Sequence, residues 1–376
     1  MSFRLFRFGL LLSLILFPTR FGFARQPHSI ILCIGDGMGV QEVQAASIYA
    51  YGSIGKLIFE QFPYKAKVRT STAYGRITDS AAAGTAMATG RKVKRGVISL
   101  ALPGPSGKVE TILEKFKAMG KSTGLVTTSY ITDATPAAFG AHEATRENRR
   151  QIAEDYLEQS RPNVMLGGGG NGMSLRLAAS AGYKVVTNAA ELQEAVQDPP
   201  LFLSGQFGER GMPFEYDGLG RFPHLADMAE AALSILDRDP DGFFLMVEGG
   251  LIDYAGHAND IARNIGETLS FAHTVERILQ WAQGRQDVLL VVTADHETGG
   301  LAVLENRGVH RYPEVSWSTT WHTDARVPLY AIGDGAEAFA GILENTAVYD
   351  VLSRQRIAPS HFLATSTSSL PVSPLP

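Results

Sequence analysis

The sequence predicts an α/β fold, a three-layer sandwich in which a central, mainly parallel sheet carries helices on both faces. Short, continuous apolar runs of strand length recur along the chain, and they alternate with segments that have apolar residues at three- and four-residue spacing. Strands that are apolar throughout are typical of parallel sheets buried on both faces. The 376 residues, of which 45% are apolar and 19% charged, suffice for one large domain or two small ones.

Seven apolar runs are predicted as strands and four amphipathic segments as helices. The first run includes the single cysteine, Cys33, which we interpret as a small buried hydrophobe rather than a reactive or metal-binding thiol. One cysteine cannot form an intramolecular disulfide. The predicted strands are 28–34, 123–128, 163–166, 184–187, 242–247, 287–293 and 327–332. The predicted helices are 111–119, 147–159, 225–236 and 264–283.

The N-terminal segment, residues 1–24, has the pattern of a secretory signal peptide. Arg4 and Arg7 precede an apolar run from Phe8 to Phe17, and Gly22 to Ala24 approximate a cleavage site. The run is about half of the roughly 20 residues that span a bilayer; a retained membrane anchor is the alternative. The mature protein is therefore expected in the periplasm or the extracellular space, without stable membrane insertion.

The remaining composition sets the domain boundaries and excludes one class of partner. The formal net charge of -4 is spread along the chain, so we expect no nucleic-acid binding. After Pro359 the chain becomes rich in serine, threonine and proline, and residues 359–376 are predicted to be a disordered tail. Residues 25–358 then form the folded domain.

Polar residues follow three of the predicted strands at the point where each strand ends. Asp36 follows the first strand, Glu248 the fifth and Asp295 the sixth. Because ligands of parallel sheets gather at the carboxyl ends of the strands, these acidic residues predict a shared centre. The glycine run Gly167 to Gly170 also follows a strand, but it favours a tight turn over a binding loop.

Two pairs of residues have the chemistry of metal ligands. Asp253 and His257 are four residues apart, so they can meet on one face of a helical turn and bind one ion. Asp295 and His296 follow a fully apolar strand, where unpaired charges are costly if they are buried. An exposed loop is the alternative for this pair. His322, taken alone, is more typical of an ordinary surface or core histidine.

Ser80 ends the polar triplet of the segment TDSAAAGTAMATG, and the small residues that follow the triplet are predicted to begin a helix. At a helix N-terminus its hydroxyl would lie where backbone N–H groups and the helix dipole favour a phosphate. The alternative is that Asp79 or Ser80 only caps the helix. A serine hydroxyl needs activation, and no histidine lies near it in the sequence, so activation by a metal is favoured.

Six segments together resemble the alkaline phosphatase family, in the family's order, across most of residues 29 to 335. They are IGDGMG around Asp36, TDSAAAGTAMATG around Ser80, ITDATPAAFGAHEATR from Ile131, FFLMVEGGLIDYAGH from Phe243, VTADHETGG from Val291 and WHTDARVPLYA from Trp321. The resemblance implies the sandwich fold, hydrolysis of small-molecule phosphate monoesters, and a cofactor set of two Zn²⁺ and one Mg²⁺ per chain. A homodimer is the family's habit.

The resemblance also implies a role for each matching residue. Ser80 would be the nucleophile that becomes a phosphoserine, and Arg146 would clamp the phosphate. The implied first zinc ligands are Asp253, His257 and His322, the second zinc ligands are Asp36, Asp295 and His296, and the magnesium ligands are Asp36, Thr135 and Glu248. All these positions hold the residue type of the family, so an active enzyme is expected.

Two positions are variable in the family, and one segment is short. Tyr254 stands where the family often has lysine, histidine or tryptophan, and Asp133 lies at a matching substrate-binding position. The stretch between His296 and His322 is short, which predicts an open site with little selectivity. The alternative functions are a phosphodiesterase, a sulfatase or a mutase on the same centre, or an exported metal- or phosphate-binding protein. Serine as nucleophile, together with Arg146, favours monoesters.

Overall fold

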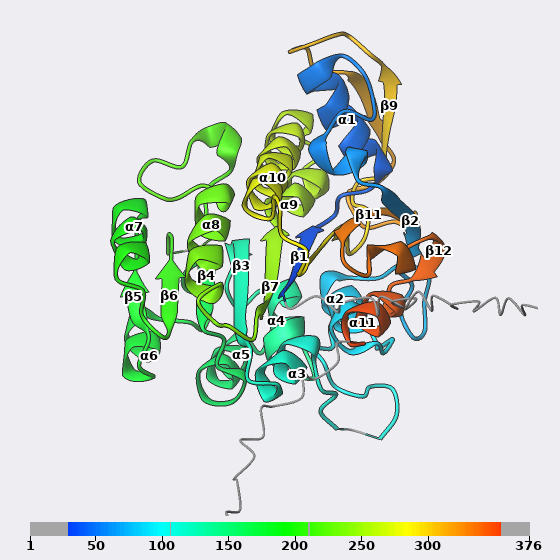
Figure 1. Ribbon diagram of the computed structural model, residues 1–376. Helices are drawn as coiled ribbons and strands as arrows, with labels where there is room; N and C mark the ends of the chain where they lie inside the picture. Colours follow the sequence, from blue (N-terminus) through cyan, green and yellow to red (C-terminus); the bar gives the residue numbers. More distant parts are fainter. Residues whose placement is uncertain (1–28, 106, 210, 355–376) are drawn as a thin grey trace, which may run out of the picture.

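The computed structural model describes residues 29–105, 107–209 and 211–354 (Figure 1). The predicted signal peptide and the predicted tail lie outside the described residues. A ten-stranded sheet runs through the described chain in the order β12-β2-β11-β8-β1-β7-β3-β4-β6-β5. The predicted three-layer α/β sandwich is confirmed, because helices cover both faces of this sheet (Figure 1).

Parallel strands form the centre and one side of the sheet. The strands β8, β1, β7 and β3 lie side by side, and they consist almost wholly of buried residues. Burial on both faces explains their continuous apolar sequence. Cys33 in β1 is fully buried, as predicted. The bounds are β1 Ser29–Gly35, β3 Ser122–Tyr130, β4 Val164–Gly168, β5 Lys184–Val186, β6 Leu203–Gln206, β7 Phe243–Gly249 and β8 Val288–Ala294.

On the other side of the sheet, one of the ten described strands, β11, runs antiparallel to its neighbours. β11 (Val327–Gly333) pairs antiparallel with β8 and with β2 (Tyr64–Arg69), and β12 (Gly341–Glu344) pairs parallel with β2. β2 and β12 were not predicted: β2 has one exposed side that interrupts its apolar residues, and β12 has no buried residue. β6 was also missed, since LSGQ is short and half polar.

Two groups of helices cover the two faces of the sheet. The helices α1, α8, α9 and α10 pack together on one face, whereas α2, α3, α4, α5 and α11 pack together on the other (Figure 1). Their bounds are α1 Val40–Tyr51, α2 Ser80–Thr89, α3 Ile112–Ala118, α4 Ala134–Gly140, α5 Arg149–Asp155, α8 Leu225–Leu236, α9 Leu251–His257, α10 Ile261–Trp281 and α11 Thr346–Leu352. Near the β5 edge lie α6 Leu175–Ser180 and α7 Ala189–Gln197.

The four helices predicted from periodicity are present; α8 has the predicted ends, and the other three have shifted ends. α3 begins after Thr111, whose hydroxyl and Glu114 form a capping box. α10 begins three residues before the predicted start, because Asp260 caps it by accepting from the N–H groups of Ala262 and Arg263. α5 ends at Asp155 and continues as a π-helical turn over Tyr156–Ser160. Single helical turns of the 3₁₀ type cover Ile58–Gln61, Glu215–Asp217 and Ala336–Ala338.

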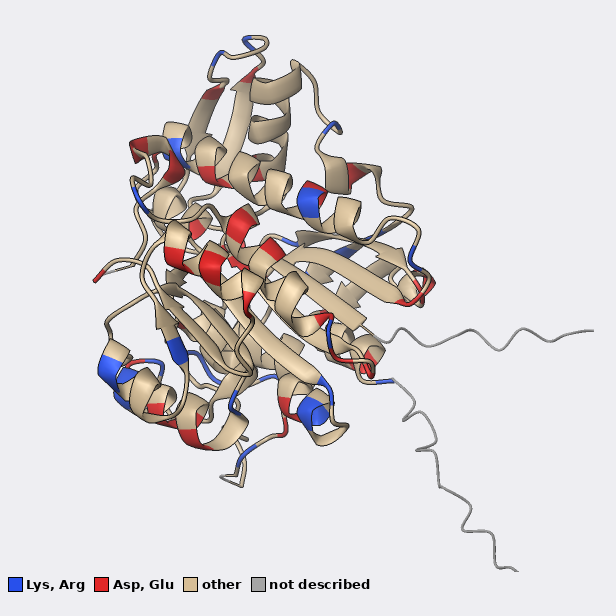
Figure 2. Ribbon diagram, turned by 60° about the vertical axis from the view of Figure 1, so that its left-hand side comes forward, with Lys and Arg blue, Asp and Glu red and all other residues tan. Residues whose placement is uncertain are grey.

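The short stretch between His296 and His322 forms a two-stranded antiparallel hairpin. Its strands, β9 (Leu301–Glu305) and β10 (Glu314–Trp317), stand apart from the main sheet and pack against α1. Leu301 joins Ala45 and Ile265 in a small separate apolar cluster. Figure 2 shows charged residues of both signs distributed over many elements. Within the described ranges, no helix is both long and apolar enough to cross a membrane.

The glycine run after β4 has a packing role. Gly167 and Gly168 continue the strand, so the predicted turn begins only after them, and Gly170 has a φ of +79°. A Cβ on Gly168 would lie 2.4 Å from the Gly211 Cα atom. The glycines therefore let two loop backbones pack against each other at the end of the sheet.

Candidate active site

The three acidic residues of the predicted centre lie at the carboxyl ends of three neighbouring strands. β8, β1 and β7 are adjacent and parallel, so their carboxyl ends meet at one edge of the sheet. Asp36 directly follows β1, Asp295 directly follows β8, and Glu248 lies at the end of β7. The structure thus brings together the three residues from which the sequence predicted a shared centre.

Asp36, Asp295 and His296 form one cluster with the spacing of a metal site. The His296 Nε2 atom lies 3.4 Å from Asp36 Oδ1 and 3.2 Å from Asp295 Oδ2. One ligand atom of each residue lies within 4.8 Å of the others. Asp36 Oδ1 and Asp295 Oδ2 are buried and have no hydrogen-bond partner. Buried carboxylate oxygens without partners are costly, and a bound cation would satisfy them.

Asp253, His257 and His322 form a second cluster beside the first. The His257 Nε2 atom lies 3.4 Å from Asp253 Oδ2 and 3.1 Å from His322 Nε2, and the His322 Nε2 atom lies 3.5 Å from Asp253 Oδ1. His296 connects the clusters, because its ring stacks on that of His322 at 3.6 Å and these two histidines and Asp253 also have ligand atoms within 4.8 Å. Thus all six predicted zinc ligands converge.

Backbone carbonyls fix the orientation of two histidine rings. The His257 Nδ1 atom lies 2.6 Å from the Thr320 carbonyl oxygen, and the His322 Nδ1 atom lies 3.0 Å from the Thr78 carbonyl oxygen. A carbonyl oxygen only accepts, so each Nδ1 carries the proton, and in the neutral ring Nε2 is then free to bind a metal. The Thr298 hydroxyl adds support, because it donates to Asp253 Oδ1 at 2.5 Å.

The buried carboxyl groups of the site favour the binding of a positive charge. Burial, followed by repulsion from Asp295 and Asp253, raises the pKa of Asp36. Burial and Asp253 likewise raise the pKa of Asp295 to about 7. Burial also works to raise the pKa of Asp253, but its contacts with His257 and the other histidines lower it. Burial and His322 lower the pKa of His296, which favours the neutral ring that binds metals.

Glu248 and Thr135 form the third group that the resemblance predicted, near Asp36. Burial raises the pKa of Glu248 to about 8 against the hydrogen bond of 2.5 Å that its Oε2 atom accepts from the Thr127 hydroxyl. Thr135, in the first turn of α4, has a buried hydroxyl that lies near Glu248 but makes no well-formed hydrogen bond. Oxygen donors of this kind suit Mg²⁺.

Ser80 is the first residue of α2, and its hydroxyl faces His296 in the candidate ligand clusters. The Asp79 side chain caps the helix by accepting from the Ala82 N–H at 3.2 Å. Ser80 itself is therefore free of the capping role, and its Oγ lies 3.3 Å from His296 Nε2. The small residues of α2 allow close packing on α4, because a Cβ on Gly84 would lie 2.9 Å from the Ala138 Cβ.

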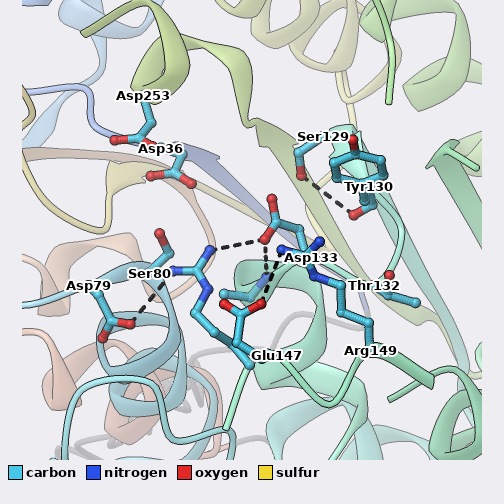
Figure 3. A network of polar contacts seen from close by, with 12 residues as sticks. Asp36, Asp79, Ser80, Ser129, Tyr130, Thr132, Asp133, Glu147, Arg149 and Asp253 are labelled. Carbon is cyan, nitrogen blue, oxygen red and sulfur yellow. Dashed lines mark hydrogen bonds and ion pairs between the residues drawn. The ribbon is translucent and has the colours of Figure 1, made fainter. Parts of the chain in front are cut away.

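Arg146 lies between two carboxylates beside Ser80. Its Nη2 atom donates to Asp133 Oδ1 at 3.0 Å, and its Nη1 atom lies 3.6 Å from Asp79 Oδ2. Figure 3 shows the two carboxylates, with Ser80 near them. Burial works to lower the pKa of Arg146, but Asp133 and Asp79 raise it, so the guanidinium stays charged. Asp133 Oδ2 in turn accepts from the Tyr254 hydroxyl at 3.2 Å. Tyr254 thus positions Asp133, which positions Arg146.

Replacing Tyr254 with phenylalanine should have a small effect that is confined to the site. Tyr254→Phe removes one hydrogen bond of Asp133 and keeps the ring, so we expect kcat/KM for the reaction that the resemblance implies to fall about two- to tenfold. The melting temperature should stay unchanged. Steady-state kinetics and thermal unfolding check this prediction. If kcat/KM fell as far as it does when Arg146 itself is replaced with alanine, the view that Tyr254 acts only by positioning Asp133 would be contradicted.

The residues of the site enclose a cavity of about 340 Å³. Sequence reasoning missed two of its lining residues, Arg95 and Trp321, because neither has a recognisable ligand pattern. Trp321 packs edge-on against the His257 ring at 5.7 Å, and it is 66% exposed. The cavity is lined by Asp36, Asp79, Ser80, Arg95, Asp133, Arg146, Asp253, Tyr254, His257, Trp321 and His322.

Comparison with known proteins gives one consistent family. The family model for alkaline phosphatase matches residues 28–310. Alkaline phosphatase 3 of Bacillus subtilis is 30% identical over 85% of this chain and 87% of its own length. The alkaline phosphatase of Escherichia coli K12 is also 30% identical, over 85% of this chain and 84% of its own. A cold-active alkaline phosphatase from a psychrophilic Shewanella species superimposes with a TM-score of 0.79 at 29% identity, covering 86% of this chain and 99% of that one.

Proposed function

Because the chain belongs to the alkaline phosphatase family and is a phosphomonoesterase, we propose that it hydrolyses its substrates through a phosphoserine at Ser80. The position of the Ser80 hydroxyl carries this proposal. It lies at the N-terminus of α2, 3.3 Å from His296 Nε2, in the cavity that Arg146 also lines. Nucleophile, anion-binding helix end and guanidinium therefore face one volume that a phosphate can enter.

The proposed cofactors are two zinc ions and one magnesium ion. Supporting observations are the buried, unpartnered oxygens of Asp36, Asp295 and Thr135, and the Nε2 atoms of His257 and His322 that their carbonyl contacts leave free. Imidazole and carboxylate suit Zn²⁺, and an all-oxygen set suits Mg²⁺. When bound, such ions lower the pKa of coordinated oxygen nucleophiles and neutralise charge that develops on the leaving group.

The chain's own residues position the phosphoryl group for transfer. Arg146 offers two donors to non-bridging oxygens, and the backbone N–H groups at the start of α2 face the same oxygens. The Ser80 oxygen attacks phosphorus and the ester bond to the leaving alcohol breaks, which leaves the phosphoryl group on Ser80. Attack by water then releases inorganic phosphate and restores the Ser80 hydroxyl. The signal-peptide pattern of residues 1–24 supports the further proposal that the enzyme is exported.

The direct test of this function is release of p-nitrophenol from p-nitrophenyl phosphate by the purified protein. We expect multiple turnovers, faster than hydrolysis of bis-p-nitrophenyl phosphate. A protein that binds inorganic phosphate but gives no turnover with either ester would contradict the proposal, as would a faster rate on the diester.

Metal content should follow the proposed ligand sets. Elemental analysis after gentle purification should give two zinc ions and one magnesium ion per chain. Thr135→Val should reduce magnesium alone, because Thr135 belongs only to that set, whereas Asp36→Asn should reduce both metals. Fewer than two transition-metal ions per wild-type chain, or equal losses in both variants, would refute the assignment.

A further inference from the structure

A second arginine lines the active-site cavity, and no role has yet been given to it. Arg95 lies on the loop that follows α2; it is one of the residues that line the same cavity as Arg146, and its side chain is exposed. Within the part of the chain that the structure describes, its guanidinium makes no hydrogen bond and no ion pair. Arg146, by contrast, is held by Asp133 and Asp79. The charge of Arg95 is therefore available to a ligand.

The backbone beside Arg95 is tied to the catalytic residues. The Gly96 N–H lies 3.2 and 3.0 Å from the two carboxylate oxygens of Asp79, the residue that caps the helix of Ser80. The Gly96 carbonyl oxygen accepts from the Arg146 N–H at 2.7 Å. Because Gly96 is hydrogen-bonded to both Asp79 and Arg146, the turn that carries Arg95 is held in place relative to Ser80 and Arg146.

Neighbouring cations on the same loop are already engaged elsewhere. The Arg91 Nη2 atom donates to the Pro103 carbonyl oxygen at 3.3 Å. The Lys92 Nζ atom lies 3.2 Å from the Glu344 carboxylate. Lys94, directly before Arg95, is exposed, and none of Arg91, Lys92 and Lys94 lines the cavity. Arg95 is thus the cation of this loop that is placed to meet a bound substrate.

The cavity is larger than the phosphoryl group that reacts in it. Its volume of about 340 Å³ is several times that of a single small group such as a water molecule. A phosphoryl group, with phosphorus and four oxygens, leaves a large part of this volume for the leaving group. A guanidinium at the edge of this cavity can reach a negative charge on the leaving group, since Arg binds carboxylate and phosphate with two parallel donors.

We propose that Arg95 determines substrate specificity by binding a second anionic group, a carboxylate or a further phosphate, on the leaving group of the substrate. This inference rests on the proposed function and adds a substrate class to it: phosphate monoesters of acids and bisphosphates are preferred over monoesters of neutral alcohols. The distal anion does not react, so the contact is the same before and during the reaction. Binding of that kind lowers KM and leaves kcat nearly unchanged.

A matched pair of substrates tests the preference. 3-Phosphoglycerate and glycerol 3-phosphate differ in having a carboxylate or an alcohol at the far end. We expect wild type to favour 3-phosphoglycerate in kcat/KM, and Arg95→Gln to reduce that ratio about three- to tenfold, mainly through KM, as for a partly exposed ion pair. Arg95→Lys should keep part of the preference, and high ionic strength should weaken it in wild type.

Arg91→Gln is the control, since it removes the same charge from the same loop outside the cavity. It should leave the ratio unchanged. A ratio that stays the same in Arg95→Gln, or that falls equally in Arg91→Gln, overturns the inference. If wild type also fails to hydrolyse p-nitrophenyl phosphate, the proposed function fails with it. If that ester is hydrolysed normally, only the role of Arg95 is refuted.

Discussion

Ser80→Ala should abolish the phosphoenzyme and reduce kcat by on the order of 10³ to 10⁶, because it removes the attacking oxygen and nothing else. Asp79 remains as the cap of α2, and alanine is a favourable residue in a helix. The variant loses one hydrogen bond to His296 but keeps all six proposed zinc ligands, so metal content and melting temperature should hardly change. Acid quenching after incubation with a ³²P-labelled monoester measures the covalent label.

Ser47→Ala is the matched control for this experiment. Ser47 is also a buried serine, but its hydroxyl donates to the Ser53 carbonyl oxygen far from the site, in the chain that leaves α1. Its replacement should lower stability and leave the label on Ser80. Undiminished label in Ser80→Ala, or label on another residue of the wild type, would show that Ser80 is not the nucleophile.

Arg146→Ala should reduce kcat/KM for phosphate monoesters by about 10² to 10³. Two charge-assisted hydrogen bonds contribute roughly 1.5 to 3 kcal/mol each, and water entering the site will replace part of that. The expected loss of transition-state stabilisation is therefore in the lower half of the range that the two hydrogen bonds together would give. The variant also leaves Asp133 and Asp79 without their cation, so its melting temperature must be measured with its kinetics.

The effect of Arg146→Ala should depend on the substrate. A phosphodiester has one non-bridging oxygen fewer to offer and one negative charge fewer, so its hydrolysis should depend less on the guanidinium. We expect a steeper loss with p-nitrophenyl phosphate than with bis-p-nitrophenyl phosphate. Arg149→Ala is the control, because Arg149 pairs with Glu147 and does not line the cavity. Equal losses on both esters would instead favour phosphodiesterase chemistry.

The residues that sequence reasoning placed best are those whose partners are local. Asp253 and His257 were predicted to meet because four residues separate them, and α9 indeed places their side chains 3.4 Å apart. The strands β1, β7 and β8 were predicted because residues buried on both faces give a continuous apolar run. Their adjacency was not predicted in detail, since strand order depends on crossovers that no local pattern records.

The positions of His322 and Arg95 in the site could not be predicted from their local sequence. His322 has no partner within its own loop, and without the family resemblance it would be read as an ordinary histidine. Its Nδ1 atom donates to the carbonyl oxygen of Thr78, which precedes α2, and its Nε2 atom then faces His257. Arg95 resembles any surface arginine until the Gly96 turn places it in the cavity.

By itself, the sequence determined the α/β class, the buried strands, the helix beside Ser80, and, through six ordered motifs, the family and the residues to examine. Only the tertiary structure decided which imidazole nitrogen is free, which buried oxygens lack partners, and which cation faces the cavity. The physical reason is range: periodicity and capping act over a few residues of one segment. The site joins residues from Asp36 to His322, and the contacts between them exist only once the sheet has brought its strands side by side.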